Sequence, residues 1–270
     1  MRYAGKVVIV TGGTKGIGEG CVRAFVEAGS KVVFCARDEA AGQKLAREVT
    51  AGGPGEAVFI RCDVSRMDEV ERLVDATVER FGRLDCLVNN AGWHPPHKPI
   101  DAFTPAEFRE LLELNLMSVF VACRRALPHL RTTRGNIINM SSLVGVMGQL
   151  HATTYVATKG AITAFTKALA VDEAVHGVRV NAISPGNIYT PLWQEAIDAA
   201  PDPAQCRADG EAAQPLGRMG TAEETGRLCV FLAAEATFTT GVDHIQSGGA
   251  ELGYCPCKKG DTVLADSSAS

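Results

Sequence analysis

"TGGTKGIG", residues 11–18, decides the fold of this chain, because it joins the apolar run "KVVIV" to a segment of helical periodicity. Gly12, Gly16 and Gly18 follow a G-x-x-x-G-x-G spacing. A tight glycine turn lets backbone amides and the positive end of a helix dipole approach a pyrophosphate. The stretch therefore predicts a dinucleotide-binding βαβ unit. A plain strand-to-helix connection is the alternative, and a P-loop is disfavoured because no G-K-[ST] follows.

Outward from this turn, short β-branched runs alternate with longer segments of helical period. Strands are expected at 6–11, 31–35, 57–62, 85–90, 135–141, 178–184 and 243–247. Helices are expected at 16–29, 39–51, 67–81, 104–131, 154–175 and 222–234, with a shorter one near 191–199. The alternation predicts an α/β, doubly wound Rossmann fold with a seven-stranded parallel sheet and helices on both faces.

The chain reads as a single domain over residues 1–254. Residues 190–214, between an expected strand and an expected helix, are rich in Pro, Ala and Asp and are expected to form a mobile cover over the site. Residues 255–270 are polar and aperiodic, which is typical of a flexible tail.

Composition narrows the function classes. The 270 residues carry a formal net charge of -4 without a basic stripe, which disfavours a nucleic-acid partner. No apolar run approaches the roughly 18 residues of a membrane span, and no signal peptide is recognised, so we expect a cytoplasmic protein with no membrane partner. Cysteines within apolar runs are expected to be buried free thiols, namely Cys21, Cys35, Cys62, Cys86, Cys123 and Cys229. Only Cys255 and Cys257 lie close together in a polar context, so no metal site is expected.

The end of the second expected strand bears on the choice of cofactor. A site for NAD(H) places an acid there, roughly 20 residues beyond the glycines, to bind the ribose 2'-hydroxyl. Ala36 occupies that place, Arg37 follows it, and Lys15 stands in the glycine turn. Two cations suit a 2'-phosphate, so the charges favour NADP(H). The alternative is NAD(H), with Arg37 solvated and Asp38 binding the hydroxyl.

Taken together and in order, six short motifs resemble the short-chain dehydrogenase/reductase family over about residues 1–254. They are "TGGTKGIG", "NNAG" (89–92), "LNL" around Asn115, "SS" (141–142), "YVATK" (155–159) and "PGNIYT" (185–190). The resemblance implies hydride transfer between a nicotinamide cofactor and a secondary alcohol or ketone. With the strand-end motif "CDV" (62–64), the expected cofactor contacts are Gly12, Lys15, Gly16, Ile17, Gly18, Arg37, Asp63, Val64, Asn89, Ala91, Gly92, Tyr155, Lys159, Pro185, Gly186, Ile188 and Thr190.

"YVATK" places Lys159 one helical turn after Tyr155, on the same face. A free tyrosine has a pKa of about 10, and a neighbouring ammonium lowers it, so we expect a phenolate that accepts a proton from a substrate hydroxyl. The resemblance further implies that Ser142 holds the substrate oxygen, that Asn115 helps hold a water for proton relay, and that Lys159 binds the nicotinamide ribose. The alternatives are a turn cap for Ser142, a buried structural amide for Asn115, and a surface pair for Tyr155 with Lys159.

The substrate side mixes aromatic and hydrogen-bonding residues. The expected substrate contacts are His94, Ser142, Gln149, Tyr155, Trp193 and Tyr254, with Trp93, His97, His151 and Leu192 lining the same pocket. Such a pocket suits a sugar with several hydroxyls or a steroid with polar ends, and the cost of leaving polar groups unpaired favours the sugar. Within the family, "SSLVGVMGQ" and "GGAELGY" resemble members that oxidise L-fucose, to the lactone, or a 17β-hydroxysteroid. That resemblance implies NAD(H), from which Ala36 departs.

Two further expectations concern partners and competing functions. Helices 104–131 and 154–175 are apolar on more than one face, and family members pair these helices across subunits, so we expect a homodimer or homotetramer. The competing functions are a nucleotide-binding interaction protein without turnover and a 3-ketoacyl reductase. The second predicts a basic docking patch that we do not find in the sequence.

Overall fold

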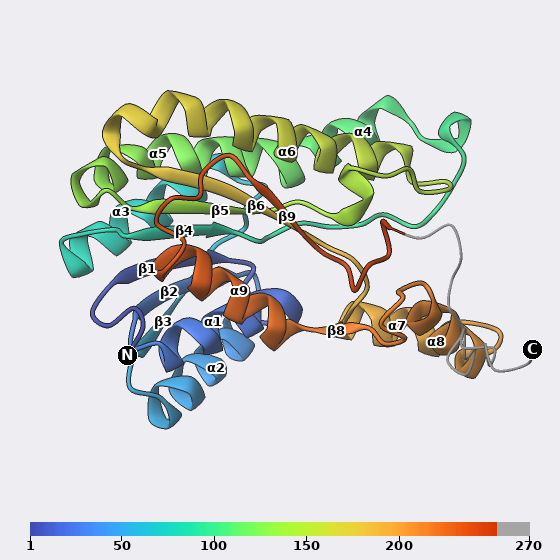
Figure 1. Ribbon diagram of the computed structural model, residues 1–270, viewed down its shortest axis with the longest axis horizontal. Coiled ribbons are helices and arrows are strands. Elements are labelled where there is room, and N and C mark those ends of the chain that lie inside the picture. Colours follow the sequence, from blue (N-terminus) through green and yellow to red (C-terminus); the bar gives the residue numbers. More distant parts are fainter. Residues whose placement is uncertain (253–270) are drawn as a thin grey trace, which may run out of the picture.

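The protein is described by a computed structural model that covers residues 1–252 of the chain. Seven parallel strands form one twisted sheet (Figure 1). In spatial order they are β3 (Glu56–Arg61), β2 (Lys31–Ala36), β1 (Val7–Thr11), β4 (Cys86–Asn89), β5 (Asn136–Met140), β6 (Arg179–Pro185) and β9 (Asp243–Gln246). All seven predicted strands and the doubly wound order are confirmed.

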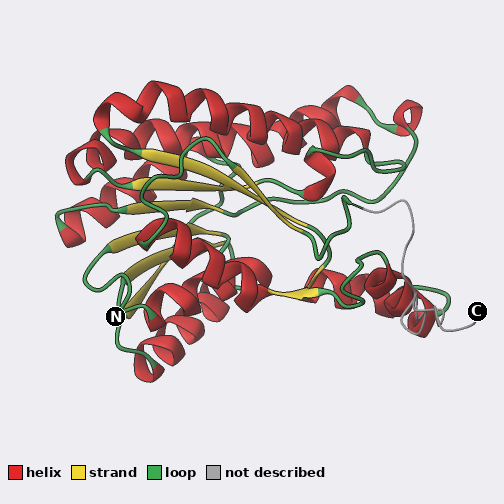
Figure 2. Cartoon of the chain, in the orientation of Figure 1, coloured by secondary structure: helices red, strands yellow, loops and turns green. Residues whose placement is uncertain are grey.

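Helices cover both faces of the sheet, as Figure 2 shows. One face carries α1 (Gly16–Glu27), α2 (Glu39–Gly52) and α9 (Ala222–Ala234), and the other carries α3 (Met67–Phe81), α5 (Ser118–Thr133) and α6 (Thr153–Glu173). The central strands β1, β4 and β5 are buried at every position, which explains their continuous apolar runs. Within residues 1–252, no helix has both the length and the apolar character needed to cross a bilayer.

The prediction of one continuous helix over 104–131 was wrong. The segment divides into α4 (Pro105–Leu112), a π-helical turn (Glu113–Met117) and α5. The side chain of Asn115, inside the π-helical turn, is buried and bonded to the loop after β4. A π-helical turn depends on such tertiary contacts, which helical periodicity does not report.

The region between β6 and α9 also contains elements that the sequence did not predict. Helix α7 (Pro191–Asp198) matches the expected short helix, and α8 (Pro203–Ala212) follows it. Two short strands, β7 (Ile188–Tyr189) and β8 (Gly220–Thr221), pair in parallel and close this segment at its base. Strands of only two residues show too little periodicity to be predicted from the sequence.

Helices α1 and α9 touch through their backbones. A Cβ atom on Gly20 would lie 2.2 Å from the carbonyl oxygen of Ala222, and one on Gly226 would lie 2.2 Å from the carbonyl oxygen of Gly20. The thiols of Cys21 and Cys229 lie 3.6 Å apart beside this contact. The close approach holds α1 firmly against the sheet, and with it the glycine turn at its start.

The six cysteines expected to be buried free thiols have that character in the structure. The Cys255 and Cys257 pair and the proposed tail lie outside the described residues. Among residues 1–252, no three His, Cys, Asp or Glu side chains are arranged to hold a metal ion.

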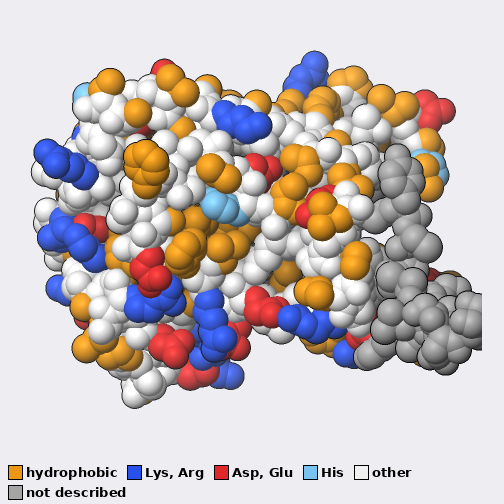
Figure 3. Space-filling view, in the orientation of Figure 1, with side chains coloured by type: hydrophobic (Ala, Val, Ile, Leu, Met, Phe, Trp, Pro, Cys, Tyr) orange, Lys and Arg blue, Asp and Glu red, His pale blue; other side chains and the backbone are white. Residues whose placement is uncertain are grey.

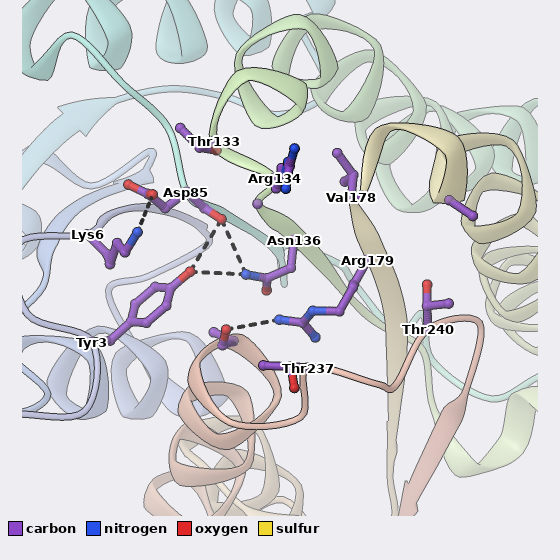
Figure 4. A pocket seen from close by; sticks show the side chains of 14 residues that line it. Tyr3, Lys6, Asp85, Thr133, Arg134, Asn136, Val178, Arg179, Thr237 and Thr240 are labelled. Atoms are coloured by element: carbon purple, nitrogen blue, oxygen red, sulfur yellow. Dashed lines mark hydrogen bonds and ion pairs between the residues drawn. The ribbon is translucent and has the colours of Figure 1, made fainter.

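The amino ends of the strands meet in a polar cluster around Asp85, at a cavity of about 400 Å³ (Figure 4). Both Asp85 carboxylate oxygens accept hydrogen bonds from the Arg83 guanidinium, at 2.6 and 2.8 Å. The same carboxylate accepts from the Val7 N–H at 2.9 Å and from Lys6 Nζ at 3.2 Å. These bonds tie the loop before β4 to the start of β1, at the opposite end of the sheet from the glycine turn.

Candidate functional site

The glycine turn forms a compact backbone cradle at the carboxyl end of β1. Gly12 and Gly16 have φ values of +66° and +57°, in the left-handed region that favours glycine. A Cβ atom on Gly18 would lie 2.0 Å from the carbonyl oxygen of Gly12, so no other residue fits there. Lys15, which precedes α1, makes no side-chain cap to the first helical amides. The turn and the helix start therefore fit a pyrophosphate, and Ile17 and Gly18 lie in the first turn of α1.

The second asparagine of "NNAG" holds this turn in place, which sequence reasoning missed. Asn90 Nδ2 donates to the carbonyl oxygens of Thr11 and Gly12, at 2.9 and 3.1 Å. The Thr11 hydroxyl accepts from the backbone N–H groups of Asn90 and Ala91, both at 3.0 Å. Alternation of side chains along β4 was the available signal, because only one of two neighbouring asparagines can face the turn.

The side chain of Asn89, by contrast, points into the core. Its Nδ2 donates to Asn139 Oδ1 at 2.8 Å, and Asn139 in turn donates to the Thr166 hydroxyl at 2.9 Å. This buried chain of polar groups links β4, β5 and α6. The side chain of Asn89 is therefore not available to a cofactor, and only its backbone could make the expected contact.

Ala36 ends β2, so a methyl group stands where a site for NAD(H) would place an acidic side chain. Asp38 uses its carboxylate as the N-cap of α2, accepting from the Ala41 N–H at 3.0 Å. Arg37 and Lys15 are exposed. Burial raises the pKa of Asp63, but hydrogen bonds from Ser65 and the nearby charge of Arg37 hold it below its ordinary value. Arg37 thus lies close enough to Asp63 to act on its charge, at the carboxyl ends of β2 and β3, and Val64 is half-buried next to Asp63.

Tyr155, Lys159 and Ser142 come together at the carboxyl end of β5. The Lys159 ammonium lies 5.8 Å from the centre of the Tyr155 ring and donates to the Met140 carbonyl at 2.7 Å. The Ser142 hydroxyl neighbours the Tyr155 phenol and lowers its pKa. A Cβ atom on Gly92 would lie 3.4 Å from Lys159 Nζ, so the end of β4 reaches the same place.

We expected Lys159 to lower the pKa of Tyr155, and in the protein without a cofactor this expectation was wrong. Burial raises the pKa of Tyr155 to about 12, against a lowering by the Ser142 hydrogen bond. Burial also lowers the pKa of Lys159 to about 8. Desolvation disfavours the charged form of both groups and is the largest contribution to each pKa. The sequence shows that the two residues are neighbours, but not how deeply they are buried.

Asn115 is fixed between the loop after β4 and helix α6. Its Oδ1 accepts from the Trp93 N–H at 2.9 Å, and its Nδ2 donates to the Trp93 carbonyl at 3.0 Å and the Thr158 hydroxyl at 3.1 Å. Both the oxygen and the nitrogen of the side-chain amide are thus hydrogen-bonded to protein groups. It braces the loop that carries the expected substrate residues against the helix that carries Tyr155.

Three of the residues expected to line the substrate pocket, His94, His97 and Gln149, lie together next to Tyr155. The ring centres of His94 and Tyr155 are 4.1 Å apart, and those of His94 and His97 are 5.0 Å apart. Gln149 Oε1 lies 3.1 Å from His94 Nε2. Burial, followed by the neighbouring His94 and His151, lowers the pKa of His97. The loops after β4 and β5 therefore bring these three side chains together beside the phenol.

The segment from Pro185 to Thr190 passes over the glycine turn. A Cβ atom on Gly16 would lie 3.3 Å from Thr190 Cγ2, and the Gly186 N–H donates to the Gln246 carbonyl at 2.9 Å. Ile188 is buried in β7. Among the expected cofactor contacts, Gly16 and Thr190 are therefore side by side.

Helices α7 and α8 occupy the segment expected to form a cover. The Thr190 hydroxyl caps α7, and the indole of Trp193 packs against Gly210 of α8. Gln214 is 2% exposed and anchors the far end, accepting from the Asn187 N–H at 2.8 Å. Tyr254, the last expected substrate contact, lies outside the described residues.

Known proteins resemble this chain over most of its length. A family model described as enoyl-(acyl carrier protein) reductase matches residues 12–251. The L-fucose dehydrogenase of Oryctolagus cuniculus is 58% identical over 94% of this chain and 88% of its own. A 3beta-hydroxysteroid dehydrogenase 1 of Eggerthella lenta is 36% identical over 92% of this chain and 94% of its own.

A solved structure has the same fold. L-sorbose reductase from Gluconobacter frateurii, complexed with NADPH and L-sorbose, superposes with a TM-score of 0.89. It is 28% identical to this chain and covers 94% of it and 100% of its own length. Three observations indicate the same family. They are the glycine turn at the start of α1, the tyrosine and lysine one turn apart on α6, and the relatives that are dehydrogenases. The chain belongs to the short-chain dehydrogenase/reductase family and is an oxidoreductase that uses a nicotinamide cofactor.

Proposed function

We propose that this enzyme oxidises the anomeric carbon of L-fucose or a closely similar sugar, giving the lactone. The observation that carries the proposal is the 58% identity to an L-fucose dehydrogenase across 94% of the chain. The group of His94, His97 and Gln149 beside the phenol supports it, because imidazole and amide groups suit a ligand with several hydroxyls.

Each catalytic residue has a task that its position supports. The bound nicotinamide supplies the acceptor for the hydride. Tyr155 takes the proton of the reacting hydroxyl, and Ser142, whose hydroxyl lowers the pKa of the neighbouring phenol, holds the same oxygen. Lys159 keeps its ammonium beside the phenol and the ribose site. Asn115 holds the loop after β4 and contributes to proton relay through α6.

The test is a panel of L-fucose, other aldoses and estradiol, monitored for reduction of the nicotinamide. The proposal expects the highest kcat/KM for L-fucose or a sugar that matches it around the anomeric carbon. A panel in which no aldose is oxidised, while estradiol is, contradicts the sugar and favours a 17β-hydroxysteroid. Exposed apolar side chains near the pocket, Trp93 at 51% and Leu192 at 53%, are the observation that keeps the steroid as the second candidate.

Arg37 favours NADP(H) over NAD(H) as the cofactor. Its guanidinium lies at the adenosine end beside Ala36, and the Asp38 carboxylate is occupied as a helix cap. We expect Arg37→Ala to lower the ratio of kcat/KM for NADP over NAD by about 10- to 100-fold, because a charge-assisted bond to the 2'-phosphate is lost. Kinetics with both cofactors measure this ratio. Arg47→Ala, an exposed arginine further along α2, is the matched control. A wild-type enzyme that prefers NAD, or a preference that survives Arg37→Ala, contradicts the assignment.

Two apolar surfaces support a homodimer or homotetramer. One is a groove of about 350 Å³ on α5 and α6, lined by Phe120, Cys123, Arg124, Leu127, Pro128, Arg131, Phe165 and Leu169. The other surrounds α9 and the edge strand β9, where Figure 3 shows hydrophobic side chains gathered on the surface. It includes Phe231 at 42% and Ile245 at 41% exposure. Exposed apolar patches of this kind mark contact sites.

A charge placed in the α5/α6 groove tests this assembly. Phe120, 41% exposed at the groove, becomes buried if a second copy covers it. We expect Phe120→Asp to reduce the sedimenting mass by half, because burying an unpaired carboxylate in an apolar contact is costly. Ile100→Asp, at a 66% exposed position away from both surfaces, is the control and should leave the mass unchanged. A wild-type monomer, or an unchanged mass for Phe120→Asp, contradicts pairing through this groove.

The structure also bears on the compartment and the cover. A cytoplasmic location agrees with cysteines that serve as small buried side chains, such as Cys21 and Cys229. Residues 190–214, which form α7 and α8, serve as the cover that excludes water from the site.

A further inference from the structure

Gln214 follows α8 at the end of the cover, which lies beyond the carboxyl ends of the strands (Figure 1). The residue is 2% exposed and its side chain makes three hydrogen bonds. Oε1 accepts from the Asn187 N–H at 2.8 Å, and Nε2 donates to the carbonyl oxygens of Gly210 and Arg218, both at 3.0 Å. Because a backbone N–H only donates and a carbonyl only accepts, these partners fix which way the amide points.

Asn187 is bonded to the same region through its backbone and its side chain. Its Nδ2 donates to the Gly210 carbonyl at 2.9 Å, and its own carbonyl oxygen accepts from the Gly220 N–H at 2.9 Å. The Gly210 carbonyl thus receives two side-chain donors, one from Asn187 and one from Gln214. These bonds hold the end of α8 and the chain at Asn187 together as one unit.

Asn187 lies within residues 185–190, the stretch that passes over the glycine turn. Both of its neighbours in the chain are expected cofactor contacts. At the end of this stretch, Thr190 Cγ2 would lie 3.3 Å from a Cβ atom on Gly16. Gln214 therefore joins the end of the cover to the segment that borders the dinucleotide site.

The same part of α8 positions Trp193. A Cβ atom on Gly210 would lie 3.1 Å from two carbon atoms of the indole and 2.3 Å from Met219 Cε, so the ring packs directly on the helix backbone. Trp193 is an expected substrate contact on α7. A displacement of α8 would therefore displace this side chain as well.

We propose that Gln214 is a positioning residue that couples the cover to the cofactor-binding segment, so that the bound dinucleotide holds α8 and Trp193 in place for the substrate. The inference rests on the proposed function, because it takes residues 190–214 as the cover of the site. Gln214 acts through Asn187 and Gly210, to which it is bonded. For α8 to move away, these bonds must break or Asn187 must move with the helix.

Hydrogen–deuterium exchange of the full-length protein, with and without saturating NADPH, tests this coupling. The exchange rate of the α8 amides is the readout, and the glycine turn reports in the same experiment that the cofactor is bound. In the wild type we expect NADPH to slow exchange at both places, by about tenfold or more in α8, because a ligand that binds only the closed form suppresses opening. The same measurement with NADH covers the alternative cofactor.

Substitution of Gln214 should separate the two places. Gln214→Met removes the three bonds at similar side-chain length, and we expect the slowing in α8 to fall to about twofold or less while the slowing at the turn remains. Gln214→Asn, which shortens the amide, is a second variant with the same expected loss. Gln205→Met is the matched control, because it replaces an exposed glutamine of α8 that bonds to Asp209, and it should keep the wild-type slowing.

The coupling is overturned by a wild type in which the cofactor slows exchange at the turn but not in α8. It is also overturned by slowing in α8 that survives both Gln214 variants, or that is lost equally in Gln205→Met. Loss of slowing at the turn and in α8 together, in both Gln214 variants, assigns Gln214 a general structural role instead. No substrate is present in this experiment, so these results contradict the inference alone, whereas a panel without aldose turnover contradicts only the proposed function.

Discussion

Replacing Tyr155 with phenylalanine should lower kcat by about 10³-fold and leave dinucleotide binding intact. General acid–base groups contribute about 10² to 10⁴ in rate, and Tyr155 is the phenol that lies next to Ser142 and Lys159. The ring and its contact with His94 remain in the variant, so the pocket keeps its shape. Initial rates with the best substrate of the panel give kcat, and fluorescence titration with the reduced cofactor gives its affinity.

A matched control for this variant is Tyr189→Phe. Tyr189 is 38% exposed on β7, and its hydroxyl contacts Gln194 on the surface. We expect that variant to retain the wild-type rate. Full activity of Tyr155→Phe contradicts the assignment of Tyr155 as the base and means that another group accepts the proton. Loss of cofactor binding in Tyr155→Phe shows instead that the phenol has a structural role.

The pKa directions explain why the phenol depends on its surroundings. Burial raises the pKa of Tyr155 to about 12 and lowers that of Lys159 to about 8. Burial disfavours the charged form of the phenol, and a cationic nicotinamide bound beside it would favour the phenolate. Proton transfer to Tyr155 would then depend on the presence of the cofactor.

Replacing Asp85 with alanine should lower the free energy of unfolding by about 1 to 3 kcal/mol, because the buried N–H of Val7 loses its acceptor. The Arg83 and Lys6 side chains are partly exposed and regain water. The Asp85 side chain is 2% exposed and accepts from Arg83, Lys6 and the Val7 N–H. Chemical denaturation of both proteins measures the difference.

A surface pair of the same geometry provides the control. Asp75 accepts a bidentate contact from Arg125, at 2.6 and 2.8 Å, but is 44% exposed. We expect Asp75→Ala to cost at most about 1 kcal/mol. Equal losses in the two variants contradict the view that burial makes the Asp85 cluster important.

The same variant should show a pH signature. Burial opposes the shift, but the bonds from Arg83, Val7 and Lys6 hold the pKa of Asp85 below its ordinary value. A lowered folded-state pKa contributes stability above the ordinary value of about 3.9, and the contribution is lost as the pH falls further. The difference between wild type and Asp85→Ala should therefore narrow below about pH 4.

Much of the fold was predictable from sequence because its signals are local. The β-branched runs and helical periods marked all seven strands of the sheet, and the glycine spacing marked the tight turn between the first strand and the first helix. The neighbouring positions of Tyr155 and Lys159 follow from helix geometry alone. Periodicity failed at the π-helical turn around Asn115 and at the short strands β7 and β8, which tertiary bonds maintain.

What the sequence determined by itself was the order of strands and helices, the glycine turn, and which residue types meet on one helix face, since each depends on residues a few positions apart. Tertiary structure alone decided that Asn90 rather than Asn89 holds the turn, and that His94 meets Gln149 across 55 positions. It also decided the direction of the Tyr155 pKa, against the expectation from its neighbour. Burial and contacts between distant segments are set by how the elements pack, and no short stretch of sequence carries that information.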